Sequence, residues 1–272
     1  MTTTLENMKT RYPVSFETIQ KFNEEGFVKL SAVLDPETLK YYEAEITAKV
    51  KELNTQHLPL EERDTYGKAF LQVSNLWQHS EIVKEFVFSE RLAAIAADLL
   101  GVRGVRLYHD QALYKESGGG ITPWHADQYY WPLSSDRTVT VWVPLQETPE
   151  DMGPLSFARG SQKHEFGRDL PISDESEAKL KVDLAEANFP LVVEPFKLGD
   201  VSFHTGWTFH RAGANNSGSP RAVMTVIYMD ADIEIIAPTN EFHAREVNDW
   251  LGGTPVGEVP SGPLNPILYS AK

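Results

Sequence analysis

The residues most able to do chemistry in this chain begin with a histidine and an aspartate that lie two positions apart. His125 and Asp127 occur within an aromatic-rich run at residues 122–128. In a β-strand, residues i and i+2 project from the same face. An imidazole nitrogen and a carboxylate oxygen at this spacing can therefore converge on one metal ion. A single His-x-Asp also occurs by chance on half-exposed strands, so further ligands are needed.

A second segment, residues 199–215, supplies candidates for a third ligand. It contains His204 and His210, and Arg221 follows at the head of a β-branched run. Two histidines and one carboxylate leave three adjacent positions open on a six-coordinate ion, which is the arrangement of non-haem Fe(II) oxygenases. The chain has 0 cysteines, so any metal must be held by nitrogen and oxygen atoms.

Together these segments resemble the phytanoyl-CoA dioxygenase family of Fe(II)/2-oxoglutarate-dependent oxygenases. The likeness is carried by His125, Asp127, His210 and an arginine 11 residues after the distal histidine, here Arg221. It extends over residues 27–230. The resemblance implies a metal site formed by the two histidines and the aspartate. It also implies that Fe(II), 2-oxoglutarate and O2 are used to hydroxylate an unactivated C–H of a small-molecule metabolite, with succinate and CO2 as coproducts.

The other histidines must then have different roles. The family pattern fits His210 better than His204, so we expect His204 to lie beside the ligands. His164 lies in a run that resembles the family's Gly-Ser-His loop, and one interpretation makes it a substrate contact. Four histidines lie among polar residues away from the motifs and are expected to have surface or structural roles: His57, His79, His109 and His243.

Arg221 is the predicted cosubstrate anchor. By alternation it shares a strand face with Val223 and Ile227, where a charge is unfavourable unless it is paired. A dicarboxylate would supply the partner through two parallel hydrogen bonds, although a protein acid is the alternative. The resemblance places Trp142 beside the cosubstrate, and Gln111 is a candidate hydrogen-bond donor to cosubstrate or substrate. A core role for Trp142 explains its position equally well.

One position departs from the family pattern. The family often has Gly-Ser after its distal histidine, with the serine reaching the cosubstrate, whereas this chain has Arg211 and Ala212. The departure removes one expected hydrogen bond. The 2-oxoglutarate carboxylate would then depend chiefly on Arg221.

The elements that must position these residues change in type along the chain. After residue 101 the sequence consists of short β-rich runs broken by Gly, Pro and Asp, which is typical of a sandwich or barrel. We predict strands near residues 104–115, 123–128, 138–146, 192–196, 200–204, 207–211 and 221–230. With the resemblance, this indicates a mainly β fold class, a double-stranded β-helix of the jelly-roll, cupin-like kind with N-terminal helices.

The remaining segments are predicted to support this core. Capping residues and helical periodicity predict helices at about 15–26, 36–54, 80–88, 89–101 and 241–251, with strands at 27–30 and 68–77. Residues 160–189 form a long segment with one short helix, which is either a solvated insertion or a lid. A length of 272 residues is compatible with a single domain. We divide it into helical support (1–101), β-helix core (102–231) and a C-terminal helix with an irregular tail (232–272).

Composition excludes several classes of partner. With 25 basic and 39 acidic residues, the net charge of −14 repels nucleic acid and disfavours a polyanionic acyl-CoA substrate. No apolar run reaches the length of a membrane helix, and the first residues do not resemble a leader, so a cytoplasmic location is expected. A small-molecule substrate remains, and the sequence does not decide between a monomer and a dimer.

Two other functions remain open at this stage. A cupin-type isomerase or a metal-independent jelly-roll binding module would have no need of a fixed cation such as Arg221. A halogenase on the same fold would need a small residue in place of the ligating carboxylate, and Asp127 argues against it.

Overall fold

The computed structural model describes residues 2–271 of the chain. The helices of this part are α1 (Thr2–Lys9), α2 (Phe16–Glu25), α3 (Pro36–Leu53), α4 (Thr65–Ala69), α5 (Glu81–Val87), α6 (Glu90–Leu100), α7 (Asp174–Glu186) and α8 (Glu241–Asp249). The strands are β1 (Phe27–Leu30), β2 (Leu71–Ser74), β3 (Gly104–Lys115), β4 (Thr122–His125), β5 (Thr138–Pro144), β6 (Leu155–Ala158), β7 (Leu191–Val193), β8 (Val201–Thr205), β9 (His210–Ala212), β10 (Arg221–Asp230) and β11 (Ile267–Ser270).

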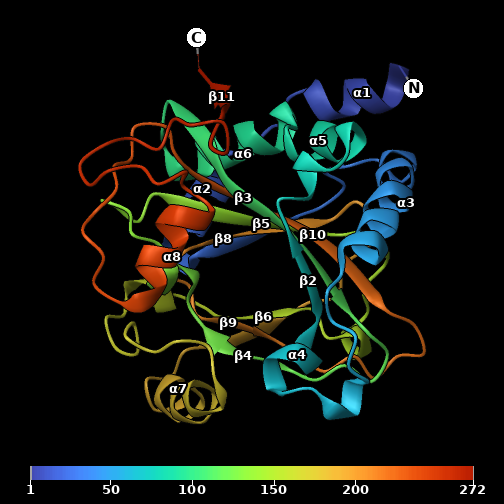
Figure 1. Cartoon of the computed structure of the whole chain (residues 1–272), viewed down its shortest axis with the longest axis vertical. Helices are drawn as coiled ribbons and strands as arrows, with labels where there is room; N and C mark the ends of the chain where they lie inside the picture. Colours follow the sequence, from blue (N-terminus) through green and yellow to red (C-terminus); the bar gives the residue numbers. More distant parts are fainter. Residues whose placement is uncertain (1, 272) are drawn as a thin grey trace.

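The strands form two antiparallel sheets (Figure 1). The larger has the order β1-β8-β5-β10-β3-β11, with β2 also paired to β3, and the smaller has the order β4-β9-β6-β7. Apolar side chains of both sheets meet in one cluster, which includes Trp142 and Val223 from the larger sheet and Leu155 and Phe157 from the smaller. Because the helices contain more residues than the strands, the predicted mainly β class is wrong, and the fold is mixed α/β.

The N-terminal helices cover the other face of the larger sheet. α6 packs across β3, β5, β10 and β11, and its apolar side chains Leu92, Ile95 and Leu99 are buried in the main core. Ser89 caps this helix by accepting a hydrogen bond from the Leu92 N–H, and Gly101 ends it in the left-handed conformation (φ 65°). The predicted caps of this helix are therefore confirmed.

Several predicted strand boundaries are wrong because contacts between distant segments decide them. The strand predicted at 123–128 ends at His125, since Asp127–Tyr130 form a 3₁₀ turn. The strand predicted at 207–211 begins only at His210, after a turn in which the Thr208 N–H donates to the Thr205 carbonyl. β6 was not predicted. The tail predicted to be irregular contains β11, which pairs with β3.

Residues 160–189 contain α7, which packs against β4. The helix begins with a capping box in which Ser173 and Ser176 each accept from the other's backbone N–H. In the described part of the chain, no helix is long and apolar enough to cross a membrane.

Candidate active site

The two predicted histidine ligands lie on paired neighbouring strands. His125 ends β4 and His210 begins β9, and the two residues are direct partners in the antiparallel register. Their imidazole ring centroids are 4.2 Å apart. Residues 85 positions apart in the chain are thereby brought side by side at the inner face of the smaller sheet.

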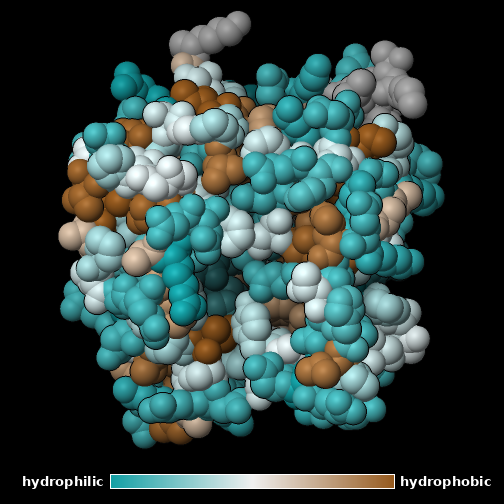
Figure 2. Space-filling model, viewed as in Figure 1, coloured by the Kyte–Doolittle hydropathy of each residue, from teal (hydrophilic) through white to brown (hydrophobic). Residues whose placement is uncertain are grey.

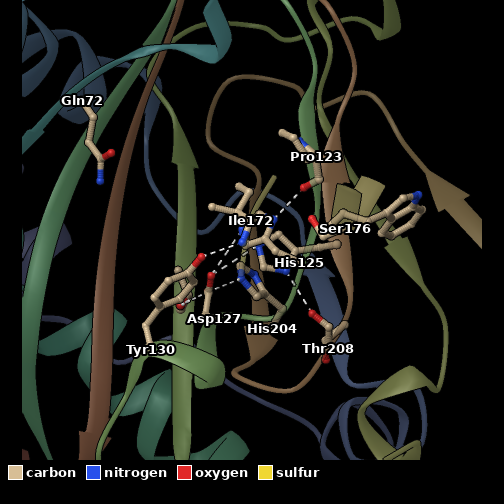
Figure 3. A network of polar contacts seen from close by, with 12 residues as sticks. Gln72, Pro123, His125, Asp127, Tyr130, Ile172, Ser176, His204 and Thr208 are labelled. Atoms are coloured by element: carbon tan, nitrogen blue, oxygen red, sulfur yellow. Dashed lines mark hydrogen bonds and ion pairs between the residues drawn. The ribbon is translucent and has the colours of Figure 1, made fainter. Parts of the chain in front are cut away.

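Backbone carbonyls fix the tautomer of both imidazoles. Nδ1 of His125 lies 2.8 Å from the Pro123 carbonyl oxygen, and Nδ1 of His210 lies 2.9 Å from that of Thr208. Since a carbonyl oxygen only accepts, each Nδ1 carries the proton and donates it. In the neutral form of each ring, Nε2 then presents a lone pair, as a metal-binding histidine requires. Figure 3 shows these contacts at His125 and Thr208.

Asp127 faces the histidines with one carboxylate oxygen. Oδ1 lies 3.5 Å from Nε2 of His125 and 3.6 Å from Nε2 of His210. Oδ2 is held from the other side, where the Thr140 hydroxyl donates to it at 3.2 Å and Nε2 of His204 lies at 3.2 Å. Only Oδ1 is thus directed at the space between the two Nε2 atoms, which favours a single-oxygen contact with an ion.

The protonation states of this group suit metal binding. Burial alone would raise the pKa of the Asp127 carboxyl, but the three surrounding imidazoles hold it well below its usual value. Burial lowers the pKa of His210 well below its usual value, and His125 acts in the same direction. The carboxylate is therefore charged and the His210 imidazole neutral, as both must be to act as ligands.

The donor set fits a metal ion, and His204 lies outside this set. One ligand atom each from His125, Asp127 and His210 lie within 4.8 Å of one another, and His204 does not belong to that group. His204 is 2% exposed and contacts the oxygen of Asp127 that faces away from the other two histidines. Its position beside the ligands agrees with the sequence-based expectation.

Arg221 lies in the same cavity, and the described part of the chain offers it no acidic partner. It is 1% exposed, donates from Nη1 to the Gly153 carbonyl, and has an Nε with no hydrogen bond. Among residues 2–271, no carboxylate oxygen lies within the 4.0 Å limit of an ion pair with it. Burial lowers the pKa of Arg221 to about 9. A buried cation with no anion beside it in the described part of the chain is unfavourable, and a bound anion would stabilise it.

The two other predicted cosubstrate contacts also line this cavity, whose volume is about 490 Å³. The Trp142 ring lies beneath the Arg221 guanidinium, at 5.4 Å from its centroid. Gln111 projects from β3 next to Thr225 of β10, its partner in the register. In Figure 2 a hollow near the middle of the face marks the cavity between α8 and the α4–β2 segment.

Sequence reasoning missed several residues of the cavity. His109, expected to be remote from the motifs, is 3% exposed and lines the cavity, so that expectation is wrong. The signal was available, because His109 and Gln111 are two positions apart on one strand and share a face. Tyr66 of α4 and Glu246 of α8 also line the cavity, but no comparable pattern in the sequence indicates it.

Two other predicted features lie elsewhere. His164 packs its ring against Phe166 and Phe189 and does not line the cavity. Of the 160–189 segment, Ile172 reaches the cavity, and its N–H donates to the Tyr130 hydroxyl at 2.7 Å (Figure 3). The rest of the segment supports β4 through α7.

Arg211, which replaces the family's glycine, has a structural partner. Its Nη1 lies 2.7 Å from Oε1 of Glu177 on α7, and Oε2 of Glu177 accepts from the Trp124 N–H at 2.8 Å. Trp124 precedes one candidate ligand and Arg211 follows the other. Glu177 therefore joins the two strands that carry the histidines.

Comparisons with known proteins agree with this site. The chain matches the family described as Phytanoyl-CoA dioxygenase (PhyH) over residues 22–223. It is 24% identical over 229 residues to the "Probable alpha-ketoglutarate-dependent hypophosphite dioxygenase" of Stutzerimonas stutzeri, covering 78% of each chain. It is 26% identical over 164 residues to the ectoine dioxygenase of Streptomyces anulatus, covering 57% of this chain and 54% of that one.

Solved structures show the same architecture. The non-heme alpha ketoglutarate dependent carbocyclase SnoK from nogalamycin biosynthesis has a TM-score of 0.78 and 26% identity, over 94% of this chain and 97% of that one. The epimerase SnoN in complex with Fe3+, alpha ketoglutarate and nogalamycin RO has a TM-score of 0.76 and 26% identity, over 99% and 100%. The family match spans more than half of the chain. The Fe3+ and alpha ketoglutarate of the SnoN complex are compatible with the His-Asp-His group found here. This chain belongs to the phytanoyl-CoA dioxygenase family of Fe(II)/2-oxoglutarate-dependent oxygenases.

Proposed function

We propose that the chain is a single-domain Fe(II)/2-oxoglutarate-dependent dioxygenase that hydroxylates an unactivated C–H bond of a small molecule. The observation that carries the proposal is the convergence of two Nε2 atoms and one carboxylate oxygen in the cavity that also holds an unpaired, buried arginine. The two facing antiparallel sheets support a double-stranded β-helix core as the scaffold.

In this proposal His125, Asp127 and His210 hold the iron, and three adjacent positions stay open for other ligands. When bound, the iron and 2-oxoglutarate supply the oxidising power for C–H hydroxylation. The protein's part is to keep both Nε2 atoms deprotonated and to keep Oδ2 of Asp127 occupied by Thr140 and His204, so that Asp127 does not block a second position.

Arg221 would bind the distal carboxylate of 2-oxoglutarate, with Trp142 as the wall beneath the guanidinium and Gln111 as a further polar contact. Ala212 also lines the cavity and has no hydroxyl to donate. The carboxylate therefore rests chiefly on one residue. This makes the binding of 2-oxoglutarate sensitive to any change at Arg221.

The substrate is proposed to be a small molecule other than an acyl-CoA. A cavity of about 490 Å³ that also accommodates 2-oxoglutarate leaves room for a metabolite of modest size. The net charge of −14 opposes the approach of a polyanionic thioester at long range. The presence of Asp127 opposes the halogenase alternative, and the unpaired Arg221 opposes a cupin-type binding module.

Anaerobic titration tests the first half of the proposal. Adding Fe(II) and then 2-oxoglutarate to the metal-free protein should give the weak visible charge-transfer band of a keto acid chelated to Fe(II). His210→Ala should give no band. A folded wild-type protein that also gives no band would refute the oxygenase assignment.

Product analysis tests the second half. A structurally similar carbocyclase and epimerase show that members of this structural group differ in outcome. Hydroxylation adds one oxygen atom from O2 to the product, whereas epimerisation leaves its composition unchanged. Mass spectrometry after turnover under ¹⁸O2 should therefore show one labelled oxygen in the product, and an unlabelled product of unchanged mass would refute hydroxylation.

A further inference from the structure

The cavity extends beyond the iron and 2-oxoglutarate positions to an end lined by α8 and its neighbours. Along β10, Arg221 lies at one end, and Ile227, which faces His109 in the register, lies towards the other. We call this end the α8 chamber and define it by six residues: His109, Tyr130, Phe242, Glu246, Asp249 and Trp250. If the proposed function holds, the substrate would occupy this chamber.

The α8 chamber contains two carboxyl groups, the partly buried one of Glu246 and the exposed one of Asp249. Glu246 is partly buried, and its Oε2 accepts from the Tyr108 hydroxyl at 2.6 Å. Among residues 2–271, no lysine or arginine nitrogen lies within 4.0 Å of Glu246 or Asp249. Burial raises the pKa of Glu246 to about 7 and Asp249 acts in the same direction, whereas Tyr108 and Trp250 oppose it. Glu246 is therefore only partly ionised near neutral pH, and a cation beside it would favour its charged form.

His109 adds a second hydrogen-bond acceptor to the chamber. Burial lowers the pKa of His109 to about 4, so the ring is neutral at physiological pH. Its Nδ1 lies 3.3 Å from the Asp110 carbonyl oxygen and donates to it, which leaves the lone pair on Nε2. In the described part of the chain, that Nε2 makes no hydrogen bond, although the residue is only 3% exposed. A ligand in the chamber would therefore meet an acceptor here.

Aromatic rings make up most of the remaining surface. Tyr130 and Phe242 pack edge to face with centroids 5.1 Å apart, and Trp250 lies against His109 at 4.9 Å. Aromatic faces attract cations as well as apolar groups. Arg245 also lines the cavity, but it is solvent-exposed and lies within 4.0 Å of no acid in residues 2–271. Among the described residues, it is the cationic group at this end of the cavity, and it would favour an anion.

We propose that the α8 chamber binds the protonated amine of a substrate whose remaining body is apolar and ring-sized. The ammonium N–H groups would be donated to Glu246 and to Nε2 of His109, and the apolar body would lie between Tyr130, Phe242 and Trp250. The inference rests on the proposed function for the position of the reacting carbon. Two acceptors and a set of π faces suit a cationic donor better than a neutral or anionic group.

Calorimetric titration with three matched probes tests the proposal. The probes are 4-phenylbutylamine, 4-phenylbutan-1-ol and 4-phenylbutyrate, together with the shorter phenylethyl and phenylpropyl sets. They are titrated into the protein with and without Fe(II) and 2-oxoglutarate, under anaerobic conditions. The amine of at least one set should bind about tenfold or more tightly than its alcohol, because a charge-assisted hydrogen bond replaces a neutral one. Equal binding of amine and alcohol in every set, or tighter binding of the carboxylate, would overturn the proposal.

Two variants of α8 locate the effect. Glu246→Gln should abolish the preference for the amine while leaving the affinity for the alcohol nearly unchanged. Glu241→Gln removes the same charge from an exposed position on the same helix, outside the cavity, and should keep the preference. Equal losses in the two variants would show a general field effect and no specific site.

The calorimetric titration and the charge-transfer titration together separate this inference from the proposed function. A missing charge-transfer band with an intact amine preference would refute the oxygenase and leave the amine site standing. A normal band without any amine preference would refute the amine site and leave the oxygenase assignment standing.

Discussion

At the scale of single residues, the candidate site depends on which atom of each side chain is already occupied. Asp127 has both a free oxygen and a fixed one, because Thr140 and His204 contact Oδ2. His125 and His210 have fixed Nδ1 atoms and free Nε2 atoms. Three ligand atoms are thus oriented before any ion arrives, which lowers the entropic cost of binding one.

The choice of His210 over His204 as ligand gives the first prediction. His210→Ala removes an Nε2 from the group whose ligand atoms lie within 4.8 Å of one another, and should abolish Fe(II)-dependent 2-oxoglutarate turnover. His204→Ala removes only a contact to Oδ2 of Asp127, and should weaken iron binding by roughly 10- to 100-fold. Iron affinity and succinate formation are measured for both proteins.

His204→Gln serves as the control, because an amide can donate to the same carboxylate oxygen. It should recover part of the lost iron affinity. If His204→Ala abolished iron binding while His210→Ala kept it, the ligand assignment proposed here would be reversed.

The unpaired guanidinium of Arg221 gives the second prediction. Arg221→Lys keeps the charge but loses the planar pair of donors, so the apparent KM for 2-oxoglutarate should rise by about 30- to 1000-fold, corresponding to roughly 2–4 kcal/mol. Iron affinity should change far less, because Arg221 is not among the candidate ligands. Steady-state kinetics and metal titration measure the two quantities separately. An unchanged KM would mean that Arg221 has a different partner.

Much of this residue-level geometry was accessible from the sequence, but not all of it. The spacing of His125, Asp127 and Arg221 relative to His210 can be recognised from the sequence alone. The orientation of Asp127 is different, because Thr140 and His204 come from β5 and β8 and meet it only in the folded chain. Contacts of this kind, between residues far apart in the chain, leave no local pattern in the sequence.

At the scale of secondary-structure elements, α7 connects the two strands that carry the candidate histidine ligands. Glu177 accepts from the Trp124 N–H on β4 and pairs with Arg211 on β9, with side-chain exposures of 15% and 21% for the ion pair. It therefore fixes the spacing of two strands that are otherwise joined by few backbone hydrogen bonds, because their register shifts between Thr122 and His125. Residues 160–189, predicted to be either a solvated insertion or a lid, thus contain the helix that supports these two strands.

This support gives the third prediction. Glu177→Ala leaves the Trp124 N–H and the Arg211 guanidinium without their acceptor, and should lower the free energy of unfolding by about 2 kcal/mol. It should also weaken Fe(II) binding, because His125 and His210 flank the two released residues. Urea denaturation and iron titration check the two effects.

Glu175→Ala is the matched control, because Glu175 lies on the same helix and is exposed. It should change neither quantity by more than about 0.5 kcal/mol. If both variants behaved alike, the loss would come from the helix itself and not from the junction of β4 and β9.

Contacts between elements also explain why some predicted strand boundaries are wrong. Local alternation predicts a strand through Asp127, but the Gln128 N–H donates to the Gly206 carbonyl and the Gln128 side chain accepts from Thr138. These contacts hold residues 127–130 in a 3₁₀ turn against the turn that precedes β9. By contrast, β3 and β10 were predicted with their observed limits, because each is a long run whose β-branched and aromatic residues are buried on both faces.

At the scale of the whole molecule, the large sheet has two different faces. One packs against the N-terminal helices through a continuous apolar core, and the other faces the small sheet and carries polar and charged side chains. The apolar face could be predicted from periodicity alone. The cavity face could be predicted only in part: Arg221 was recognised on it, whereas the buried Lys115 looks like an ordinary strand-end cation in the sequence.

Lys115 gives the last prediction, which concerns the stability of the whole fold against pH. The side chain is 0% exposed, and its Nζ donates to the Gly120 carbonyl and to Thr122 Oγ1. Burial lowers the pKa of Lys115 from 10.5 to about 6, and Arg221 and Arg211 act in the same direction. Between these two pKa values the unfolded chain binds a proton that the folded chain does not. The free energy of unfolding should therefore rise with pH across this window, by at most about 1.4 kcal/mol per pH unit.

Comparison with Lys115→Met isolates this effect, because titrations elsewhere, such as those of the buried tyrosines, cancel in the difference. The unfolding free energy of the wild type minus that of the variant should rise steadily from about pH 6 to about pH 9.5, as measured by urea denaturation. Below about pH 6 both states of the wild type are protonated and the difference should level off. Lys181→Met, at an exposed position on α7, should give a flat difference over the same range. A flat line for Lys115→Met as well would mean that the folded protein keeps this lysine charged, which would contradict the prediction.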